Sequence, residues 1–319
     1  MSATGERPDL SVIVVTHNRA ELALATLRSA GTAVRALEVE WIVVDSGSSD
    51  GTPDAIEAAL PEVRVLRERN IGFAAANNRG LPHARGRYVL LLNPDVETAS
   101  GTFDQLVATL DERRDIGVAS VVQNAPDGTL QYSIRRFPSA WLALGEALAA
   151  AHWTPLRRWR EEEPQSARYR EVAPADWLVG AFLIARAEAL AQVGPLDERF
   201  FLFSEETDWC FRFHRAGWRV VHLPTMTVTH HTGHAPGPDL SAQQSYAKIL
   251  FARKHYGRVR ASTMRAALAL RHALRAALAT VAGRSRPQWA ARAAVERRAL
   301  AVVLGVREPP FVHMSPFDA

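Results

Sequence analysis

Two aspartates, Asp45 and Asp95, each follow a short apolar run, at residues 39–44 and 88–92. Runs this short and this rich in branched residues are typical of buried strands in a parallel sheet. In open α/β folds, ligands bind at the carboxyl ends of such strands. Asn93-Pro94-Asp95 would also suit an ordinary turn. The alternative is that both carboxylates lie at a ligand-binding edge.

Further polar residues belong to the same predicted edge. The first apolar run, residues 10–15, ends in a segment that contains Thr16, Asn18 and Arg19. Ser46 follows Asp45 and begins a helix entry, whose free amide groups suit an anion or are merely capped by side chains. Asp45 itself could accept hydrogen bonds from a nucleobase or a ribose.

A second acidic group, formed by Glu205, Glu206 and Asp208, follows three phenylalanines within residues 200–203. Acids at the first turn of a helix can simply be solvated, because the helix dipole favours them there. Their aromatic neighbours favour a pocket instead, in which a carboxylate can act as a general base.

Histidines gather in a glycine-containing segment after a strand-like stretch, as His230, His231 and His234. A single histidine is usually structural, whereas a His-His pair on a loop is more typical of a metal ligand.

The elements that must position these groups alternate between strand and helix. Strands are predicted at residues 10–15, 39–44, 63–66 and 88–92, with helices at residues 19–31, 50–60 and 72–86. Such alternation predicts an α/β fold with a doubly wound, nucleotide-binding half. The predicted domain order is a nucleotide-binding half at residues 1–124, a substrate-facing half at 125–250 and a helical extension at 251–319.

Missing motifs and the single cysteine disfavour several classes of protein. No G-x-G-x-x-G follows the first strand and no G-x-x-x-x-G-K-[ST] is present, which disfavours dehydrogenases and P-loop enzymes. The single cysteine, Cys210, excludes an internal disulfide and a multi-cysteine zinc site. Neither a signal core nor an apolar run of about 20 residues is found. We therefore expect a cytoplasmic protein.

The charge is unevenly distributed. Residues 251–307 contain 13 Lys or Arg and one acid, Glu296, in a chain whose net charge is only +4. Amphipathic helices of this composition would suit an anionic membrane surface, on the inner face of the cell membrane. The alternative is packing against the catalytic domain or a second protomer. Nucleic acid is not expected, because no binding motif accompanies the charge.

The order of motifs resembles the inverting, GT-A-fold glycosyltransferases of family 2, within them the rhamnosyltransferase-like branch acting on bacterial cell-surface glycans. The motifs extend from about Leu10 to about His234 and read "SVIVVTHNR", "VVDSGSSDGT", "NIGFAAANNRG", "YVLLLNPDV", "WLVGAFLIAR", "PLDERFFLFSEETDWCFRFHRAGW" and "VTHHTG". The resemblance implies a Rossmann-like half with a mixed sheet. The implied donor is a nucleotide-diphosphate sugar linked to dTDP or UDP, with L-rhamnose one candidate sugar.

By matching position, the resemblance assigns roles to individual residues. The residues expected to bind the donor are Thr16, Asn18, Arg19, Asp45, Ser46, Asn70, Gly72, Asn78 and Asn93. Asp95 would bind a divalent metal, Mn²⁺ or Mg²⁺, with His230, or alternatively His231, as a further ligand. Asn93 stands where the family often has the first aspartate of Asp-x-Asp, which removes one anionic ligand.

The resemblance also implies the reaction. Glu206 matches the catalytic base, Glu205 is the alternative, and Asp208 would orient the following helix or a substrate hydroxyl. An inverting transfer is a single displacement, in which a carboxylate deprotonates the acceptor hydroxyl as it attacks the anomeric carbon. The acceptor would be a glycan or a lipid-linked sugar. A nucleotidyltransferase and a non-catalytic sugar-nucleotide-binding scaffold are the alternative functions.

Overall fold

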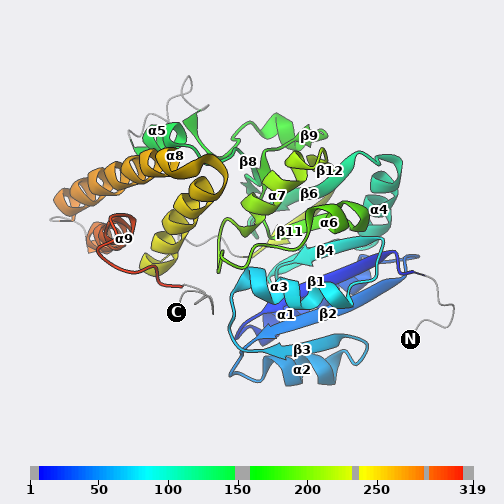
Figure 1. The fold of residues 1–319 in the computed structure, drawn as a ribbon. Helices are drawn as coiled ribbons and strands as arrows, with labels where there is room; N and C mark the ends of the chain where they lie inside the picture. Colours follow the sequence, from blue (N-terminus) through cyan, green and yellow to red (C-terminus); the bar gives the residue numbers. More distant parts are fainter. Residues whose placement is uncertain (1–6, 148–158, 232–236, 284–286, 312–319) are drawn as a thin grey trace. The chain divides into compact units, whose positions relative to one another are not determined.

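The computed structural model describes residues 7–147, 159–231, 237–283 and 287–311 (Figure 1). The chain divides into two compact units. The first contains residues 1–135, 165–198 and 208–233, and the second contains residues 136–164, 199–207 and 234–319.

A mixed, 10-stranded sheet forms the centre of the first unit. Its main strands run in the order β3-β2-β1-β4-β11-β6-β12-β5, while β7 pairs with β6 and β9 pairs with β12. Their bounds are β1 Leu10–Thr16, β2 Val39–Ser46, β3 Arg64–Glu68, β4 Tyr88–Leu92, β5 Val96–Thr98, β6 Ile116–Asn124, β7 Leu130–Gln131, β9 Ala173–Pro174, β11 Phe182–Arg186 and β12 Arg219–His230. A separate two-stranded sheet pairs β8 Ile134–Arg135 with β10 Trp177–Leu178.

Strands β1 to β4 are mutually parallel wherever they pair, as the alternating sequence predicts. Strand β11 then inserts antiparallel between β4 and β6, which makes the sheet mixed. Every residue of β1 and β4 is buried. This burial explains why both strands are apolar along nearly their whole length instead of alternating with polar residues.

The helices of the first unit supply the apolar faces that complete its core. α1 Ala20–Thr32 buries Ala23, Thr26, Leu27 and Ala30, a spacing that puts them on one helical face. The other helical segments of this unit are α2 Thr52–Ala59, α3 Phe73–Gly80, η1 Leu81–His83, α4 Thr102–Glu112, η4 Ser166–Tyr169 and α6 Ala187–Val193. The predicted strands and helices before residue 92 all form, with ends within a few residues.

Two apolar segments depend on partners far away in the chain. Most of residues 177–185 are buried, and they form two strands, β10 and β11, in different sheets. The stretch before His230 forms the single strand β12, whose register against β6 shifts between Leu223 and Thr227. Pairing with distant partners decides both outcomes.

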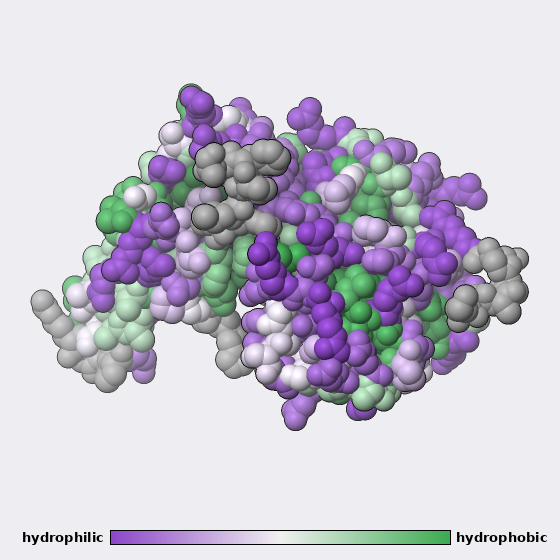
Figure 2. All heavy atoms as spheres, turned by 60° about the horizontal axis from the view of Figure 1, so that its bottom comes forward, coloured by the Kyte–Doolittle hydropathy of each residue, from purple (hydrophilic) through white to green (hydrophobic). Residues whose placement is uncertain are grey.

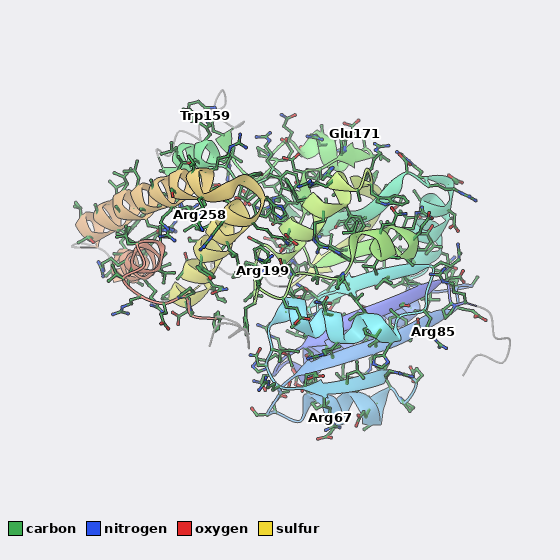
Figure 3. All side chains as sticks on the ribbon, in the orientation of Figure 1. Arg67, Arg85, Trp159, Glu171, Arg199 and Arg258 are labelled. Carbon is green, nitrogen blue, oxygen red and sulfur yellow. The ribbon has the colours of Figure 1, made fainter. Side chains whose placement is uncertain are left out.

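The second unit is helical. α5 Ala140–Ala147, α8 Pro238–Ala282 and α9 Pro287–Val303 pack around a small core that includes Ile249, Leu268 and Val303. Figure 1 shows α8 as two straight parts, which meet at Gly257. The positive φ of 82° at this glycine lies outside the helical range. Arg258, labelled in Figure 3, begins the second part.

Helix α7, Glu205–Arg215, begins in residues of the second unit and continues in residues of the first. Within the described ranges of the chain, no helix has both the length and the apolar composition needed to cross a bilayer. Figure 2 shows hydrophilic side chains over much of one face, with apolar areas between them.

Candidate functional site

The ends of β1 and β2 bring the first predicted donor residues together. The parallel register pairs Thr16 with Asp45, and their exposed fractions are only 1% and 3%. Ser46 is also buried at the end of β2. The sheet therefore holds polar side chains at its carboxyl edge, where a ligand can meet them.

Hydrogen bonds join the two loops that follow these strands. Asn18, whose φ of 52° is left-handed, accepts a bond from the Ser49 amide at 2.8 Å. Its own amide donates to the Ser48 hydroxyl at 2.8 Å. The Ser48 amide in turn donates to Oδ2 of Asp45 at 3.0 Å. Asn18 thus fixes the loop arrangement, while Arg19 is exposed beside it.

Three buried oxygen atoms at this edge make no hydrogen bond with a described residue. They are Oγ1 of Thr16, Oδ1 of Asp45 and Oδ1 of Asn93. A buried polar atom without a partner costs free energy of about 1–3 kcal/mol. A ligand that carries N–H or O–H groups, such as a nucleobase or a ribose, would satisfy them.

The loop before α3 lies close to the loop after β2. A Cβ added at Gly47, whose φ is 76°, would stand only 2.9 Å from the Asn70 amide nitrogen. Oδ1 of Asn70 accepts a long bond of 3.3 Å from the Gly72 amide. Asn70 and Gly72 therefore shape a third loop near the ends of the strands.

Asn78 has a positioning role that its sequence motif does not reveal. Its amide group bonds both the main-chain oxygen and the main-chain nitrogen of Leu196, at 2.8 and 3.0 Å. It also contacts Glu198 at 3.0 Å. The side chain therefore ties α3 to a loop more than a hundred residues away, and direct donor contact stays a prediction.

Asp95 and His230 come together as the resemblance implies. Oδ1 of Asp95 lies 3.5 Å from Nε2 of His230, and both residues are almost fully buried. Two contacts bring the segments together: His230 pairs with Val96 across β12 and β5, and the His231 amide donates to the Asp95 main-chain oxygen at 2.9 Å.

Gln131, which sequence reasoning missed, orients the His230 ring. Its Nε2 donates to the main-chain oxygen of His230 at 3.0 Å, so its Oε1 is left to accept from Nδ1 of His230 at 2.8 Å. Burial lowers the pKa of His230, although the Asp95 carboxylate acts in the opposite direction. A neutral ring with its proton on Nδ1 presents the lone pair of Nε2 toward Asp95.

A carboxylate oxygen and an imidazole nitrogen that face each other fit a divalent cation. Among the described residues, no group of three or more His, Cys, Asp or Glu side chains is arranged to hold a metal ion. The described part of the chain would supply these two ligands, and a bound substrate or water would supply others. Such an incomplete set is usual for Mg²⁺ bound together with substrate phosphates.

The neighbouring histidines differ from His230. Nε2 of His231 lies 3.1 Å from Glu97 and not beside Asp95. His234 lies outside the described residues. The structure thus brings His230 to the aspartate, although its role as a metal ligand stays a prediction.

The acidic pair Glu205 and Glu206 opens helix α7, among residues of the second unit. The two residues before it, Phe203 and Ser204, have left-handed φ values of 70° and 65°. Such backbone strain in non-glycine residues is concentrated at functional sites. Burial and the nearby charge of Glu206 raise the pKa of Glu205 well above its ordinary value.

The two carboxyl groups differ in burial. Glu205 is 4% exposed and its buried Oε2 has no hydrogen-bond partner among the described residues. A buried carboxyl group with a raised pKa holds its proton to a higher pH than an exposed one does. Which of the two carboxylates acts as the base stays a prediction, with Glu206 at the position that the resemblance gives to the base.

Asp208 has a structural partner. It is fully buried and pairs with Arg212 one turn later, at 2.9 Å. Arg212 also donates to the main-chain oxygens of Val193 and Pro195. These contacts fit the predicted role of Asp208 in orienting the helix.

The geometry can now be compared with known proteins. A family description, glycosyl transferase family 2, matches residues 11–173. An N-acetylglucosaminyl-diphospho-decaprenol L-rhamnosyltransferase of Mycobacterium tuberculosis is 32% identical over 289 residues, which cover 82% of this chain and 91% of that protein. Rhamnosyltransferase WbbL of Escherichia coli K12 is 22% identical over 51% of this chain and 62% of its own length.

The fold is also found among solved structures. Mannosyltransferase PcManGT from Pyrobaculum calidifontis, in complex with GDP-Man and Mn²⁺, matches with a TM-score of 0.58. That match covers 95% of this chain and 89% of the other, at 20% identity. It supports the GT-A fold with additional C-terminal helices.

The chain belongs to glycosyl transferase family 2. It is a glycosyltransferase of the rhamnosyltransferase-like kind, as its sequence motifs imply.

Proposed function

We propose that the protein transfers a sugar, with L-rhamnose the leading candidate, from a dTDP- or UDP-linked donor to a hydroxyl group of a lipid-linked acceptor. The rhamnosyltransferase relative that matches 82% of the chain supports both the sugar and the type of acceptor. In this proposal, residues 1–124 bind the donor and residues 125–250 bind the acceptor.

The buried oxygen atoms at the ends of β1, β2 and β4 carry the proposal. Thr16 and Asp45 accept hydrogen bonds from the base and ribose of the donor, and Asn93 accepts one nearby. Asn18 holds the two loops in place, and the exposed Arg19 supplies positive charge for the diphosphate. These buried oxygen atoms have no partner among the described residues, and the N–H and O–H groups of a bound donor would supply one.

Asp95 and His230 would hold the divalent metal, Mn²⁺ or Mg²⁺, which when bound neutralises charge on the leaving diphosphate. Gln131 keeps the His230 ring in the tautomer that presents Nε2. The contribution of the chain itself is to hold these two ligands in register across β5 and β12.

Glu206 acts as the general base. Its carboxylate takes the proton of the acceptor hydroxyl while the hydroxyl oxygen attacks the anomeric carbon. The bond from that carbon to the diphosphate oxygen breaks in the same step, so the anomeric configuration inverts. Burial and the charge of Glu206 raise the pKa of Glu205, which is the alternative base.

A lipid-linked acceptor would be met at a membrane surface. The second unit carries the basic segment at residues 251–307, with exposed apolar side chains at Val259, Leu278 and Val281. Positive charge beside exposed apolar groups suits a surface of anionic phospholipids. We propose that this helical unit attaches the protein peripherally to the inner face of the cell membrane.

Thermal stabilisation by nucleotides tests the donor site. dTDP, UDP and their sugars, with and without Mn²⁺ or Mg²⁺, should raise the melting temperature only when they bind the native state. We expect a metal-dependent shift with dTDP or UDP compounds and a larger one with the true donor sugar. No shift with any of them would refute the proposed donor site.

A further inference from the structure

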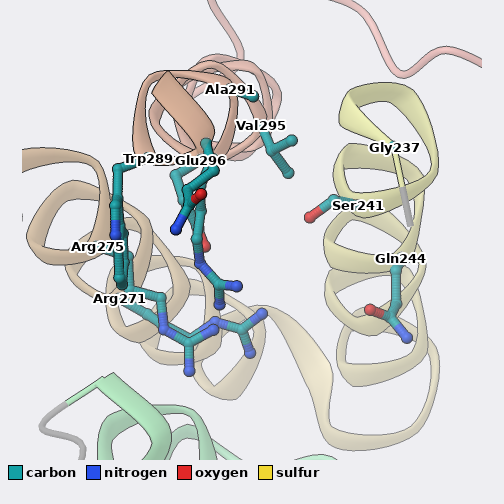
Figure 4. A pocket seen from close by; sticks show the side chains of 11 residues that line it. Gly237, Ser241, Gln244, Arg271, Arg275, Trp289, Ala291, Val295 and Glu296 are labelled. Carbon is teal, nitrogen blue, oxygen red and sulfur yellow. The ribbon is translucent and has the colours of Figure 1, made fainter. Parts of the chain in front are cut away.

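A cavity of 580 Å³ lies within the second unit, between the two parts of α8 and the helix α9 (Figure 4). It is lined by Gly237, Ser241, Gln244, Arg271, Arg275, Gln288, Trp289, Ala291, Arg292, Val295 and Glu296. None of the predicted donor, metal or catalytic residues belongs to it. Its function is therefore a separate question.

Three arginines, Arg271, Arg275 and Arg292, give the cavity its charge. Arg271 pairs with Glu146 at 2.6 Å. Glu296, the acid of the lining, is held by His272 at 2.6 Å. Within the described ranges, Arg275 and Arg292 form no ion pair, so the cavity keeps an excess of positive charge.

The N–H groups of these arginines have only some of their hydrogen-bond acceptors among the described residues. Nε of Arg271 is buried and has no acceptor among the described residues. Arg275 donates to the main-chain oxygen of Glu146 at 3.0 Å, which is a neutral acceptor. Burial and the charges of Arg271 and Arg292 lower the pKa of Arg275, while the carboxylates of Glu296 and Glu146 act in the opposite direction. Clustered guanidinium groups are costly when buried unless an anion neutralises them.

The remaining walls are of two kinds. Figure 4 shows Arg271 and Arg275 together on the second part of α8, with Ser241 and Gln244 across from them on the first part. Trp289, Ala291 and Val295 of α9 supply apolar surface. An occupant with an anionic group and an apolar part would match both kinds of wall.

We propose that this cavity binds a phosphate or diphosphate group, through Arg275 and Arg292 with Arg271 behind them. Arginine suits this anion because its planar donors can hold two phosphate oxygens at once. The assignment as an anion site depends only on the lining. That the anion is the diphosphate of a lipid-linked acceptor rests on the proposed function.

Calorimetric titration of the full-length protein with inorganic pyrophosphate tests the site. An excess of chelator excludes metal-assisted binding elsewhere, and Asp95→Asn should bind pyrophosphate as the unaltered protein does. Arg275→Gln and Arg292→Gln should each weaken binding at least about tenfold, because each loses a charged hydrogen bond. Arg265→Gln is the matched control, since Arg265 is exposed on the same helix outside the cavity.

A second arm separates a free anion from a lipid headgroup. It uses phosphatidylcholine vesicles that contain a long-chain isoprenyl diphosphate, and vesicles with phosphatidylglycerol of equal total charge. Binding to the isoprenyl diphosphate that depends on Arg275 and Arg292 supports a lipid source, whereas such dependence with pyrophosphate alone supports a free anion.

Three results would overturn the site: no binding in either arm, binding unaffected by Arg292→Gln, or equal weakening by Arg265→Gln. Arg292 is exposed, so its variant remains informative if Arg275→Gln fails to fold. Nucleotide stabilisation is measured on the same variants. If it persists while anion binding is absent, only the cavity assignment fails. If it is absent in the unaltered protein, the donor proposal fails instead.

Discussion

At the scale of single residues, the chain places the carboxylate of Asp95 against the imidazole of His230, in a buried position. Gln131 determines the tautomer of His230, because its hydrogen bonds place the ring proton on Nδ1. An aspartate-histidine pair in this form is prepared to share a cation.

Replacing Asp95 tests that role. Asp95→Asn keeps the shape of the side chain but removes its charge, so we expect a loss of kcat/KM of at least about 100-fold. Metal-dependent stabilisation by the nucleotide should also disappear, while the melting temperature without ligands changes little. Glu97→Gln is the control, because Glu97 is a half-exposed neighbour that contacts His231. Normal transfer by a folded Asp95→Asn variant would refute the assignment.

The acidic pair at the start of α7 makes a second prediction. Glu206→Gln should lower kcat by about 10²–10⁴-fold, because it removes the group that accepts the proton. Donor-induced stabilisation should remain. Glu205→Gln is the matched control and should retain most of the activity, because in this proposal Glu206 and not Glu205 accepts the proton.

Steady-state rates and nucleotide melting shifts on both variants provide the measurement. If the larger loss of kcat follows Glu205→Gln, then Glu205 and not Glu206 is the base.

At the scale of elements, the donor edge depends on how closely loops approach one another. The loops after β1 and β2 are joined through Asn18, and the loop before α3 approaches Gly47. Helix α3, which follows the third loop, is itself fixed because Asn78 bonds the backbone at Leu196. The site is thus an arrangement of loop backbones as much as of side chains.

Alanine substitutions at two glycines distinguish the effect of backbone strain from the effect of the contact between loops. Gly47→Ala and Gly51→Ala each place alanine at a left-handed φ, which should destabilise either variant by about 1–2 kcal/mol. At Gly47 the added Cβ would also press on the Asn70 amide, whereas at Gly51 nothing lies within 4 Å. We therefore expect Gly47→Ala alone to weaken nucleotide binding, as measured by titration. Equal affinities in the two variants would contradict the proposed loop contact.

At the scale of the whole molecule, charge and function are divided along the chain. The sheet unit holds the predicted donor and metal residues, whereas the helical unit holds the basic segment and the arginine-lined cavity. This division suits an acceptor that is held in a membrane: the helical unit would bind the membrane surface, and the sheet unit would bind the donor. A transferase must reach a substrate that cannot leave the bilayer.

Binding to lipid vesicles tests this arrangement. The protein should sediment with vesicles that contain an anionic phospholipid, and less of it should do so as salt shortens the Debye length from about 10 Å at 0.1 M to about 3 Å at 1 M. Replacing both Leu278 and Val281 by serine should weaken binding, since both are exposed on α8. Val172→Ser, in the sheet unit, should leave it unchanged. Sedimentation that is insensitive to salt and to these helix changes would exclude the proposed surface.

Much of the first half of the fold was predictable. Strand β4 was expected at residues 88–92 and forms at Tyr88–Leu92, because a buried parallel strand needs an unbroken apolar run. The insertion of β11 between β4 and β6 was not predictable, since strand order depends on pairing between residues far apart in the chain, such as Arg186 with Tyr88 and Ile184 with Ala119. The same reason explains why residues 177–185 divide between two sheets, which no local pattern indicates.

Local spacing and motif order were enough to predict the family, the α/β alternation and the types of the candidate residues. Only the packing of distant segments shows that the His230 ring faces the Asp95 carboxylate while the His231 ring contacts Glu97, and that Gln131 orients His230. It also shows that Glu205 is the more deeply buried of the two acids and that three arginines share one cavity. The physical reason is common to these cases: burial and contact depend on which distant segments pack together, and no local pattern in the chain records that packing.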